Sequence, residues 1–290
     1  MTFKELMKIR NNENNYSELC NLSNFVPFVG AGMSSSIYPL WHEFLESFEL
    51  LDDERKTLQY FLDLGKYEEA ATFIAEKNHT LFIRQVKATF KNSKIEYSKI
   101  QNATKKIFEI TNDMIITTNL DEILETIWNA NNKKFEAIIT PNCEEQFNNA
   151  ISSKTQNILI KLHGTVAESS QYILTAEQYN NHYGQISNNK IDTALSFVRD
   201  LLRCLDSRTI LFLGSSLKSD RIIDILKYLH NKNNYINHYA FLPLEDYEEK
   251  SELNLLRERE LAECGIVPIW YPINDYDSIE ILIDNLKKNK

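Results

Sequence analysis

The sequence has few cysteines, and none lies close to another. Cys20, Cys143, Cys204 and Cys264 are the only four among 290 residues, and no Cys-x-x-Cys pair occurs. Structural zinc sites are usually built from such pairs, so we expect neither a zinc site nor any other metal site. Unpaired thiols are also typical of a reducing compartment, and we therefore expect the protein to be cytoplasmic.

Long apolar runs are absent as well. No stretch approaches the roughly 20 apolar residues of a membrane-spanning helix. Residues 1–5, Met-Thr-Phe-Lys-Glu, do not begin the apolar core of a secretory signal. We therefore expect no association with a membrane.

An excess of basic residues is also missing. Lys and Arg number 32 against 41 Asp and Glu, which gives a formal net charge of −9. Nucleic-acid-binding domains usually carry a basic surface, so we expect no direct binding of nucleic acid. One group of basic residues is compatible with a local patch but is more typical of a solvated helical face: Arg84, Lys87, Lys91, Lys94 and Lys99.

Glycine is scarce, and its distribution is uneven. Of the 7 glycines, Gly30, Gly32, Gly164 and Gly214 fall within short motifs that follow apolar runs. Glycine permits positive φ angles and a close approach of the backbone to a ligand. We interpret this concentration as room left for a ligand.

Apolar runs of strand length alternate with helical patterns along the chain. Continuous runs of this kind are typical of buried parallel strands, and they cover residues 25–29, 114–117, 135–140, 158–162, 209–213, 239–242 and 266–270. The alternation predicts an α/β fold, a Rossmann-like doubly wound parallel sheet in one domain over residues 1–290. Residues 52–108 are too long for one crossover and show helical spacing, so we expect an inserted small helical subdomain that covers the ligand-binding rim.

Four motifs follow the ends of predicted strands. They are Gly30-Ala31-Gly32-x-Ser34, Thr117-Thr118-Asn119-Leu120-Asp121, His163-Gly164 and Gly214-Ser215-Ser216-Leu217. Ligands of open α/β sheets bind outside the carboxyl ends of the strands. We therefore expect the four motifs to meet at one rim.

Each motif alone also has an ordinary structural explanation. The first could cradle a pyrophosphate with backbone N–H groups, but it lacks the third glycine of the dinucleotide fingerprint and the Lys-Ser/Thr of a P-loop. Asn119 and Asp121 are typical of a helix N-cap, and Gly214 to Ser216 fit a capped loop. A lone histidine such as His163 is most often structural, although histidine also suits general-base chemistry. The absence of a Gly-x-Ser-x-Gly elbow disfavours a serine hydrolase.

Together and in this order, the four motifs resemble those of the sirtuin family. The resemblance is closest to the Sir2-type, sirtuin-like NADases of bacterial anti-phage defence, which lack the zinc module. Two flanking segments add to it, Pro39-x-Trp41 and Leu174-Thr175-x-x-x-Tyr179, and it spans residues 25–230. What it implies is an extended NAD molecule bound as a substrate, with no metal.

The resemblance also implies roles for individual residues. His163 would be the general base, and Asn119 would orient the nicotinamide ribose and a water, with Asp121 nearby. The remaining NAD-binding residues would be Gly30, Ala31, Gly32 and Ser34 at the phosphates, Gly214 and Ser215 at the adenosine half, and Thr118 and Ser216 beside them.

Two departures separate this chain from sirtuin deacylases. Deacylases carry two Cys-x-x-Cys pairs and a Pro-Asp-Phe-Arg segment, where this chain has Pro39-Leu40-Trp41-His42. Both favour hydrolysis of NAD to nicotinamide and ADP-ribose, and the resemblance implies that this activity makes the protein an effector of anti-phage defence. A protein deacylase or ADP-ribosyltransferase, and a non-catalytic module that senses NAD or ADP-ribose, are the alternatives; a linear and a cyclic product both stay open.

No sensor domain is recognisable after residue 230. An enzyme that drains NAD needs a switch, and the resemblance implies control by assembly. We expect a homo-oligomer, a partner subunit such as a HerA-type ATPase or a phage-sensing protein, or both.

Overall fold

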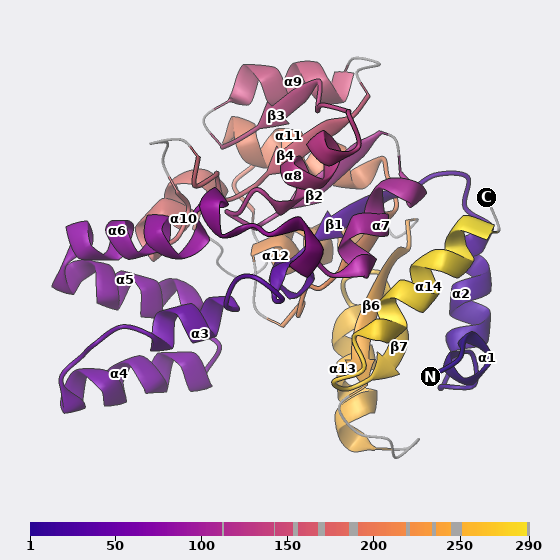
Figure 1. Ribbon diagram of the computed structural model, residues 1–290, viewed down its shortest axis with the longest axis horizontal. Coiled ribbons are helices and arrows are strands. Elements are labelled where there is room, and N and C mark those ends of the chain that lie inside the picture. The colour runs from indigo at the N-terminus through magenta and orange to yellow at the C-terminus, as the bar shows by residue number, and fades with distance from the viewer. Residues whose placement is uncertain are drawn as a thin grey trace.

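The computed structural model describes residues 1–111, 113–141, 143–152, 156–167, 172–185, 191–218, 221–233, 236–244 and 251–288. Within these ranges, parallel strands form one seven-stranded sheet in the order β3-β4-β2-β1-β5-β6-β7 (Figure 1). The strands are β1 (Val26–Val29), β2 (Met114–Thr117), β3 (Ala137–Ile139), β4 (Ile158–Lys161), β5 (Ile210–Leu213), β6 (His238–Leu244) and β7 (Ile266–Pro272). Each overlaps a predicted strand, and the predicted Rossmann-like α/β fold is confirmed.

The strand order reverses on the two sides of β1. Val29 is in register with Thr117 of β2 on one side and with Leu213 of β5 on the other. The chain builds β2, β3 and β4 on the first side before it returns to β5. Connections that leave in opposite directions open a crevice at this point, outside the carboxyl ends of the strands.

Helices cover both faces of the sheet (Figure 1). Successive strand residues point to opposite faces, so Phe28 and Phe212 belong to one apolar core, while Val29 and Leu211 belong to the other. The first core includes side chains of α9 (Glu144–Ser152), α11 (Ser196–Asp206), α12 (Arg221–Asn233) and α13 (Glu252–Ala262). The second includes side chains of α1 (Phe3–Leu6), α2 (Asn12–Cys20), α7 (Asn102–Ile110), α8 (Ile123–Ala130) and α14 (Asp277–Lys288).

A separate group of helices lies between β1 and β2 in sequence and beside the sheet in space (Figure 1). It consists of α3 (Trp41–Glu46), α4 (Asp52–Asp63), α5 (Tyr67–Lys77) and α6 (His79–Phe90), which we call the cap. The cap has its own core, including Phe44, Phe82 and Val86, and this core continues onto Ile123 and Ile127 of α8. The capping side chain of Asn78 accepts from Leu81 N and begins α6.

The predicted insertion 52–108 contains only helices and turns. Its last helix, α7, belongs to the sheet layer: Lys106 donates to Glu280 and Asp284 of α14 at 2.6 and 2.8 Å. The cap core instead extends from Tyr38 to Ile100 before it reaches α8. We therefore propose residues 38–100 as the bounds of the helical subdomain.

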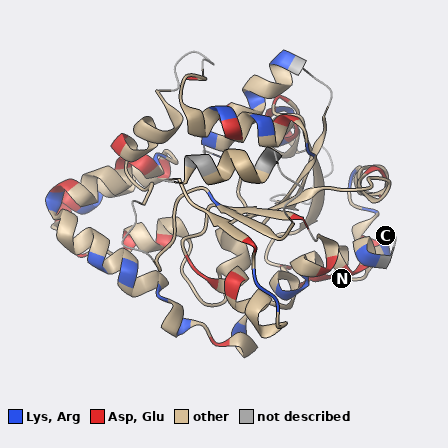
Figure 2. Cartoon of the chain, turned by 90° about the horizontal axis from the view of Figure 1, so that it is seen from above, with Lys and Arg blue, Asp and Glu red and all other residues tan. Residues whose placement is uncertain are grey.

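Basic and acidic residues are interspersed along the outer helices (Figure 2). The five basic residues from Arg84 to Lys99 are all exposed, and Lys99 pairs with Glu96 at 2.8 Å. This arrangement matches a solvated helical surface. None of the helices in the described ranges is both long and apolar enough to cross a membrane.

Candidate functional site

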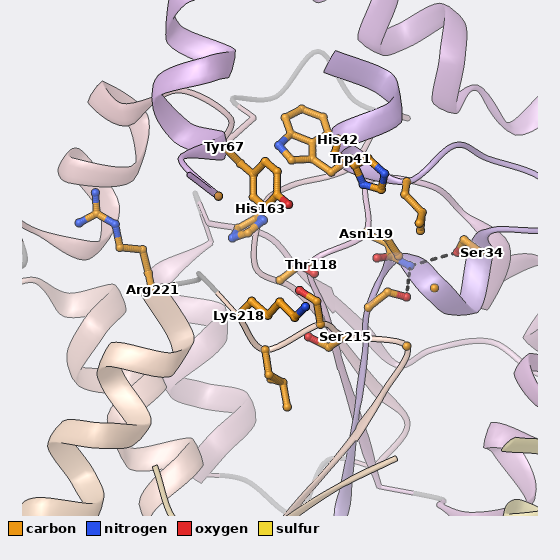
Figure 3. Close-up of a pocket in the computed structure, with 18 of the residues that line it drawn as sticks. Ser34, Trp41, His42, Tyr67, Thr118, Asn119, His163, Ser215, Lys218 and Arg221 are labelled. Carbon is orange, nitrogen blue, oxygen red and sulfur yellow. Dashed lines mark hydrogen bonds between the residues drawn. The ribbon is translucent and has the colours of Figure 1, made fainter. Parts of the chain in front are cut away.

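A cleft of about 1130 Å³ opens at the carboxyl edge of the sheet (Figure 3). All four motifs line it. Trp41, His42 and Tyr67 reach it from the cap, so the cap covers one side of the rim. The structure thus brings together every predicted site residue: Gly30, Ala31, Gly32, Ser34, Thr118, Asn119, Asp121, His163, Gly214, Ser215 and Ser216.

The glycines of the first and fourth motifs serve contact between two loops. A Cβ added at Gly30 would lie 2.6 Å from the carbonyl oxygen of Gly214. One added at Gly214, where φ is +65°, would lie 2.6 Å from the backbone nitrogen of Met33. The interpretation that these glycines leave room for a ligand is therefore wrong, because protein backbone fills that space.

Two backbone N–H groups of the first motif are used in hydrogen bonds, one to the fourth motif and one within the first motif. Gly32 N donates to Gly214 O at 2.9 Å, and Met33 N donates to Gly30 O at 3.1 Å. These two N–H groups are therefore engaged within the protein and do not form a phosphate cradle. The side chain of Ser34 and the other backbone atoms of the loop still line the cleft.

Asn119 ties the second motif to the first. Its Nδ2 donates to Gly30 O at 3.1 Å and to Ser34 Oγ at 3.0 Å, and its carbonyl oxygen points away from Ser34 (Figure 3). Its backbone N–H donates to Thr117 Oγ1, which itself donates to Val29 O. An amide with both ends placed in this way can present a fixed acceptor to a ribose hydroxyl or a water.

Asp121 has a structural partner. Its Oδ1 accepts a hydrogen bond from Ile123 N at 3.0 Å, in the turn that leads into α8. The residue is buried. Burial raises the pKa of this carboxyl, while the charge of Lys161 opposes the rise. The N-cap residue of α8 is Glu122, so Asp121 accepts from the first N–H of the helix from one position before the cap.

Sequence reasoning missed Lys161. This β4 residue is completely buried, and its Nζ donates to the backbone oxygen of Asp121 and, at 2.8 Å, to Glu125 Oε1. The contacts fix the loop that carries Asn119 and Asp121 to the strand that precedes His163. A signal existed, because a lysine within an apolar strand needs a partner when buried.

The two ring nitrogens of His163 differ in their contacts. The residue is 8% exposed, and its Nδ1 lies 3.4 Å from the hydroxyl of Tyr179. Its Nε2 is buried and, among the described residues, has no hydrogen-bond partner. Burial, and to a smaller extent His182, lower the pKa of His163 to about 3, so the ring is neutral near pH 7.

Strand register brings Asn119 and His163 to the same edge. Thr117 of β2 is in register with Lys161 of β4, and each polar residue follows two positions later. Two adjacent parallel strands therefore deliver an oriented amide and a neutral imidazole into one cleft.

A comparison with protein families matches residues 113–269 to the SIR2-like domain, more than half of the chain. The chain belongs to the SIR2-like family. The match contains the second, third and fourth motifs and begins after the first. A search of curated proteins found no match. Family membership supports an NAD-related activity in general.

In this SIR2-like chain the fourth motif is held from α13. Arg257 donates to Ser216 O at 2.7 Å and to Leu217 O at 2.9 Å, and Leu217 has a φ of +53°. These bonds fix the loop that presents Ser215 and Ser216 to the cleft. No local pattern around Arg257 signals this contact, because its partners are about 40 residues away.

In the SIR2-like chain, Cys204 and Cys264 are buried, and Cys20 and Cys143 are partly exposed. In the part of the chain that the structure describes, no group of three or more His, Cys, Asp or Glu residues is arranged to hold a metal ion.

Proposed function

We propose that this SIR2-like protein hydrolyses NAD to nicotinamide and ADP-ribose. The observation that carries the proposal is the unpaired Nε2 of His163, buried beside the cleft that also holds the oriented amide of Asn119. Leaving a buried polar group unpaired costs about 1–3 kcal/mol. Such a group in a ligand-sized cleft is a reason to look for a function that uses it.

The proposed reaction breaks the bond between the nicotinamide nitrogen and C1′ of the ribose. The bonding electron pair leaves with nicotinamide, which becomes neutral, and positive charge develops on the ribose. A water then attacks C1′ and loses one proton to His163 Nε2. Asn119 would hold the ribose and the water, and Trp41 and Tyr67 would exclude competing water from the capped end.

Thr118 and the two glycine loops stay predictions for NAD binding, and Asp121 stays a predicted member of the catalytic group with His163 and Asn119. Their position supports this: all line the cleft, and the loops follow β1 and β5 where the strand order reverses. The crevice at such a reversal is where dinucleotides bind in doubly wound sheets. We propose that the phosphates lie over residues 30–34 and the adenosine half over Gly214, Ser215 and Ser216.

Product analysis tests the proposal. Purified protein incubated with NAD should release nicotinamide and ADP-ribose in equal amounts, measured by liquid chromatography. Nicotinamide release that requires an acylated peptide or a protein acceptor would identify the deacylase or transferase alternative. Saturable NAD or ADP-ribose binding without turnover, measured by calorimetry, would identify the sensor, and a cyclic product would replace hydrolysis with cyclisation.

We further propose that the activity serves anti-phage defence in the bacterial cytoplasm under control of assembly. The motif order supports this through the resemblance to sirtuin-like NADases that lack the zinc module. Cells that express the wild-type chain with its partner should lose NAD and yield fewer phage after infection than cells with His163→Ala. Equal phage yield from both would contradict the defence role.

Assembly is tested separately. We propose that the isolated chain is weakly active and that self-association, or a partner such as a HerA-type ATPase or a phage-sensing subunit, raises its turnover. NAD cleavage should rise with protein concentration in step with the mass measured by light scattering. A monomer with full, concentration-independent activity would contradict this control.

A further inference from the structure

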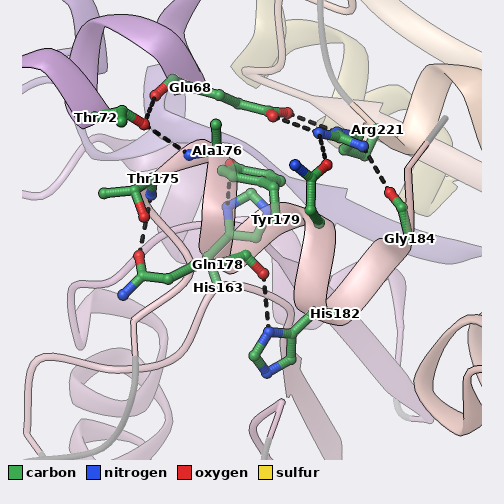
Figure 4. A network of polar contacts seen from close by, with 11 residues as sticks. Glu68, Thr72, His163, Thr175, Ala176, Gln178, Tyr179, His182, Gly184 and Arg221 are labelled. Carbon is green, nitrogen blue, oxygen red and sulfur yellow. Dashed lines mark hydrogen bonds and ion pairs between the residues drawn. The ribbon is translucent and has the colours of Figure 1, made fainter.

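Tyr179 lies between His163 and an arginine. Its hydroxyl is 3.4 Å from His163 Nδ1, and the two rings meet edge to face with centroids 5.1 Å apart. On its other side, the guanidinium carbon of Arg221 lies 5.8 Å from the ring centroid. Tyr179 is on α10 (Ala176–Tyr183), and Arg221 is the first residue of α12 (Figure 4).

Arg221 is itself held on two sides. Its Nε and Nη2 donate to the carboxylate of Glu68 in the cap at 2.8 and 2.6 Å. Its Nη1 donates to Gly184 O at 2.9 Å, and Nη2 also reaches Asn180 Oδ1 at 3.0 Å. A two-pronged arginine–carboxylate pair fixes direction as well as distance. Arg221 therefore joins the sheet layer, the cap and the end of α10 (Figure 4).

The cap also holds the start of α10. Ala176 N donates to Thr72 Oγ1 of α5 at 2.9 Å (Figure 4). The helix that carries Tyr179 is thus fixed to α5 directly at its first turn and through Arg221 near its last.

We propose that Tyr179 is a positioning residue for His163 and that the Arg221–Glu68 pair keeps it in place. The hydroxyl of Tyr179 accepts a hydrogen bond from Nδ1–H, so that the single ring proton stays on Nδ1 and Nε2 is left unprotonated. The hydrogen bond at one imidazole nitrogen determines the tautomer and hence the state of the other. This inference rests on the proposed function, in which Nε2 takes a proton from water.

The surroundings of Nε2 favour this tautomer. With the proton on Nδ1, the unpaired group at Nε2 is a lone pair; in the other tautomer it would be a buried N–H without an acceptor. Buried donors without an acceptor are rarer in proteins than buried acceptors without a donor. Burial also disfavours the doubly protonated ring.

Removing one hydroxyl tests the role of Tyr179. Tyr179→Phe keeps the ring beside Arg221 but cannot hold the proton on Nδ1. We expect kcat for nicotinamide release to fall about tenfold to a hundredfold, a fraction of what a general base contributes, with KM for NAD within twofold. Tyr183→Phe is the matched control, because Tyr183 lies on the same helix and its ring centroid is 6.2 Å from that of His163, against 5.1 Å for Tyr179. It should keep wild-type kcat.

A double-mutant cycle tests Arg221. Arg221→Gln and Glu68→Gln should each lower kcat by severalfold in the wild-type background. Neither should lower it further in Tyr179→Phe, because their effect on His163 passes through the lost hydroxyl. Fully additive losses would show that the ion pair acts on the site by another route and would overturn its positioning role. Melting temperatures of all variants separate these effects from unfolding.

Nitrogen NMR of the His163 ring gives a result independent of NAD turnover. The wild-type spectrum should show a protonated Nδ1 and an unprotonated Nε2, and Tyr179→Phe should shift signal toward the other tautomer. A wild-type ring protonated on Nε2, or a Tyr179→Phe ring identical to wild type, would overturn the proposal. If the spectra behave as expected but the wild-type protein cleaves no NAD, then the proposed function fails and the role of Tyr179 in fixing the ring stands.

Discussion

One buried histidine lies at the amino ends of the strands and another at their carboxyl ends. The two histidines differ in what their ring nitrogens contact. His238 begins β6 at the amino edge, where its Nδ1 accepts from Ile210 N at 3.2 Å. His163 follows β4 at the carboxyl edge, where its Nε2 lacks a partner among the described residues and the ring lines the cleft. Burial lowers the pKa of both, to about 4 and about 3. A shifted pKa therefore does not distinguish a structural histidine from a candidate base; the unpaired nitrogen in a cleft does.

Replacing each histidine with glutamine should give the largest difference in NAD cleavage. His163→Gln should lower nicotinamide release by about 10²–10⁴-fold, the usual contribution of a general base. His238→Gln should leave the activity per folded molecule unchanged. Nicotinamide release and circular dichroism of both variants check this. Equal activity losses would remove the functional distinction between the two edges.

The buried lysine at the carboxyl edge allows a second contrast. Lys161→Met leaves the partly buried carboxylate of Glu125, 14% exposed, without its cation, and breaking a fully buried pair costs about 3–5 kcal/mol, which is the upper bound here. Lys106→Met, in a pair with Glu280 whose side chains are 25% and 28% exposed and do not line the cleft, should cost about 0–1 kcal/mol. Denaturant unfolding measures both. Nicotinamide release should fall only in Lys161→Met. Unchanged activity in the folded fraction of this variant would contradict the role of Lys161 in holding the loop that carries Asn119.

A third contrast compares two glycines with positive φ, Gly214 in the loop after β5 and Gly265 in the loop before β7. The Cβ of Gly214→Ala would meet the backbone of Met33 at 2.6 Å, whereas that of Gly265→Ala would meet the side chain of His230 at 2.7 Å. A side chain can move away, while a backbone in a tight loop cannot. Both pay for the left-handed conformation, about 1–2 kcal/mol, and we expect Gly214→Ala to lose more. Thermal unfolding checks the order, and an equal loss would show that the loop contact yields easily.

The final contrast concerns the pH dependence of stability, to which both buried histidines contribute. Both histidines have folded pKa values below 6.5, the ordinary value of a histidine side chain. The unfolded chain therefore binds more protons as pH falls below 6.5, and the free energy of unfolding decreases until the folded pKa is reached. Each histidine contributes a slope of about 1.4 kcal/mol per pH unit in that window. The free energy of unfolding, measured at several pH values between 7 and 4, should depend on pH less steeply by this slope in each His→Gln variant. An unchanged pH dependence would show that the histidine is solvated in the folded protein.

Sequence predicted the sheet because its strands are buried on both faces and therefore appear as short apolar runs. It also located the carboxyl edge, since polar motifs directly follow those runs. The position of the histidine at 238 went unnoticed, because the apolar run there begins one residue later. The contacts of Lys161, Arg221 and Arg257 were out of reach for another reason. Each joins segments about 40 residues apart or more, and only the pairing of strands and helices brings them together.

The glycine interpretation failed at Gly30, Gly32 and Gly214 for a related reason. A sequence shows that a position tolerates no side chain, but not what occupies the space. Here the occupant of the space beside Gly30 is the loop after β5. The bounds of the cap were uncertain in the same way, since α7 has the helical pattern of the cap but packs on α14.

The register between β2 and β4 has a consequence for how the chain can vary. Asn119 and His163 stand at equal offsets from paired residues, Thr117 and Lys161. Because side chains alternate along a strand, one inserted or deleted residue between either strand and its motif would turn the polar group away from the cleft. Length changes should therefore be tolerated in the connections before β2 and β4 but not in the two residues after them. The spacing from strand end to polar residue is thus a stricter criterion for functional relatives of this chain than the identity of the strand residues.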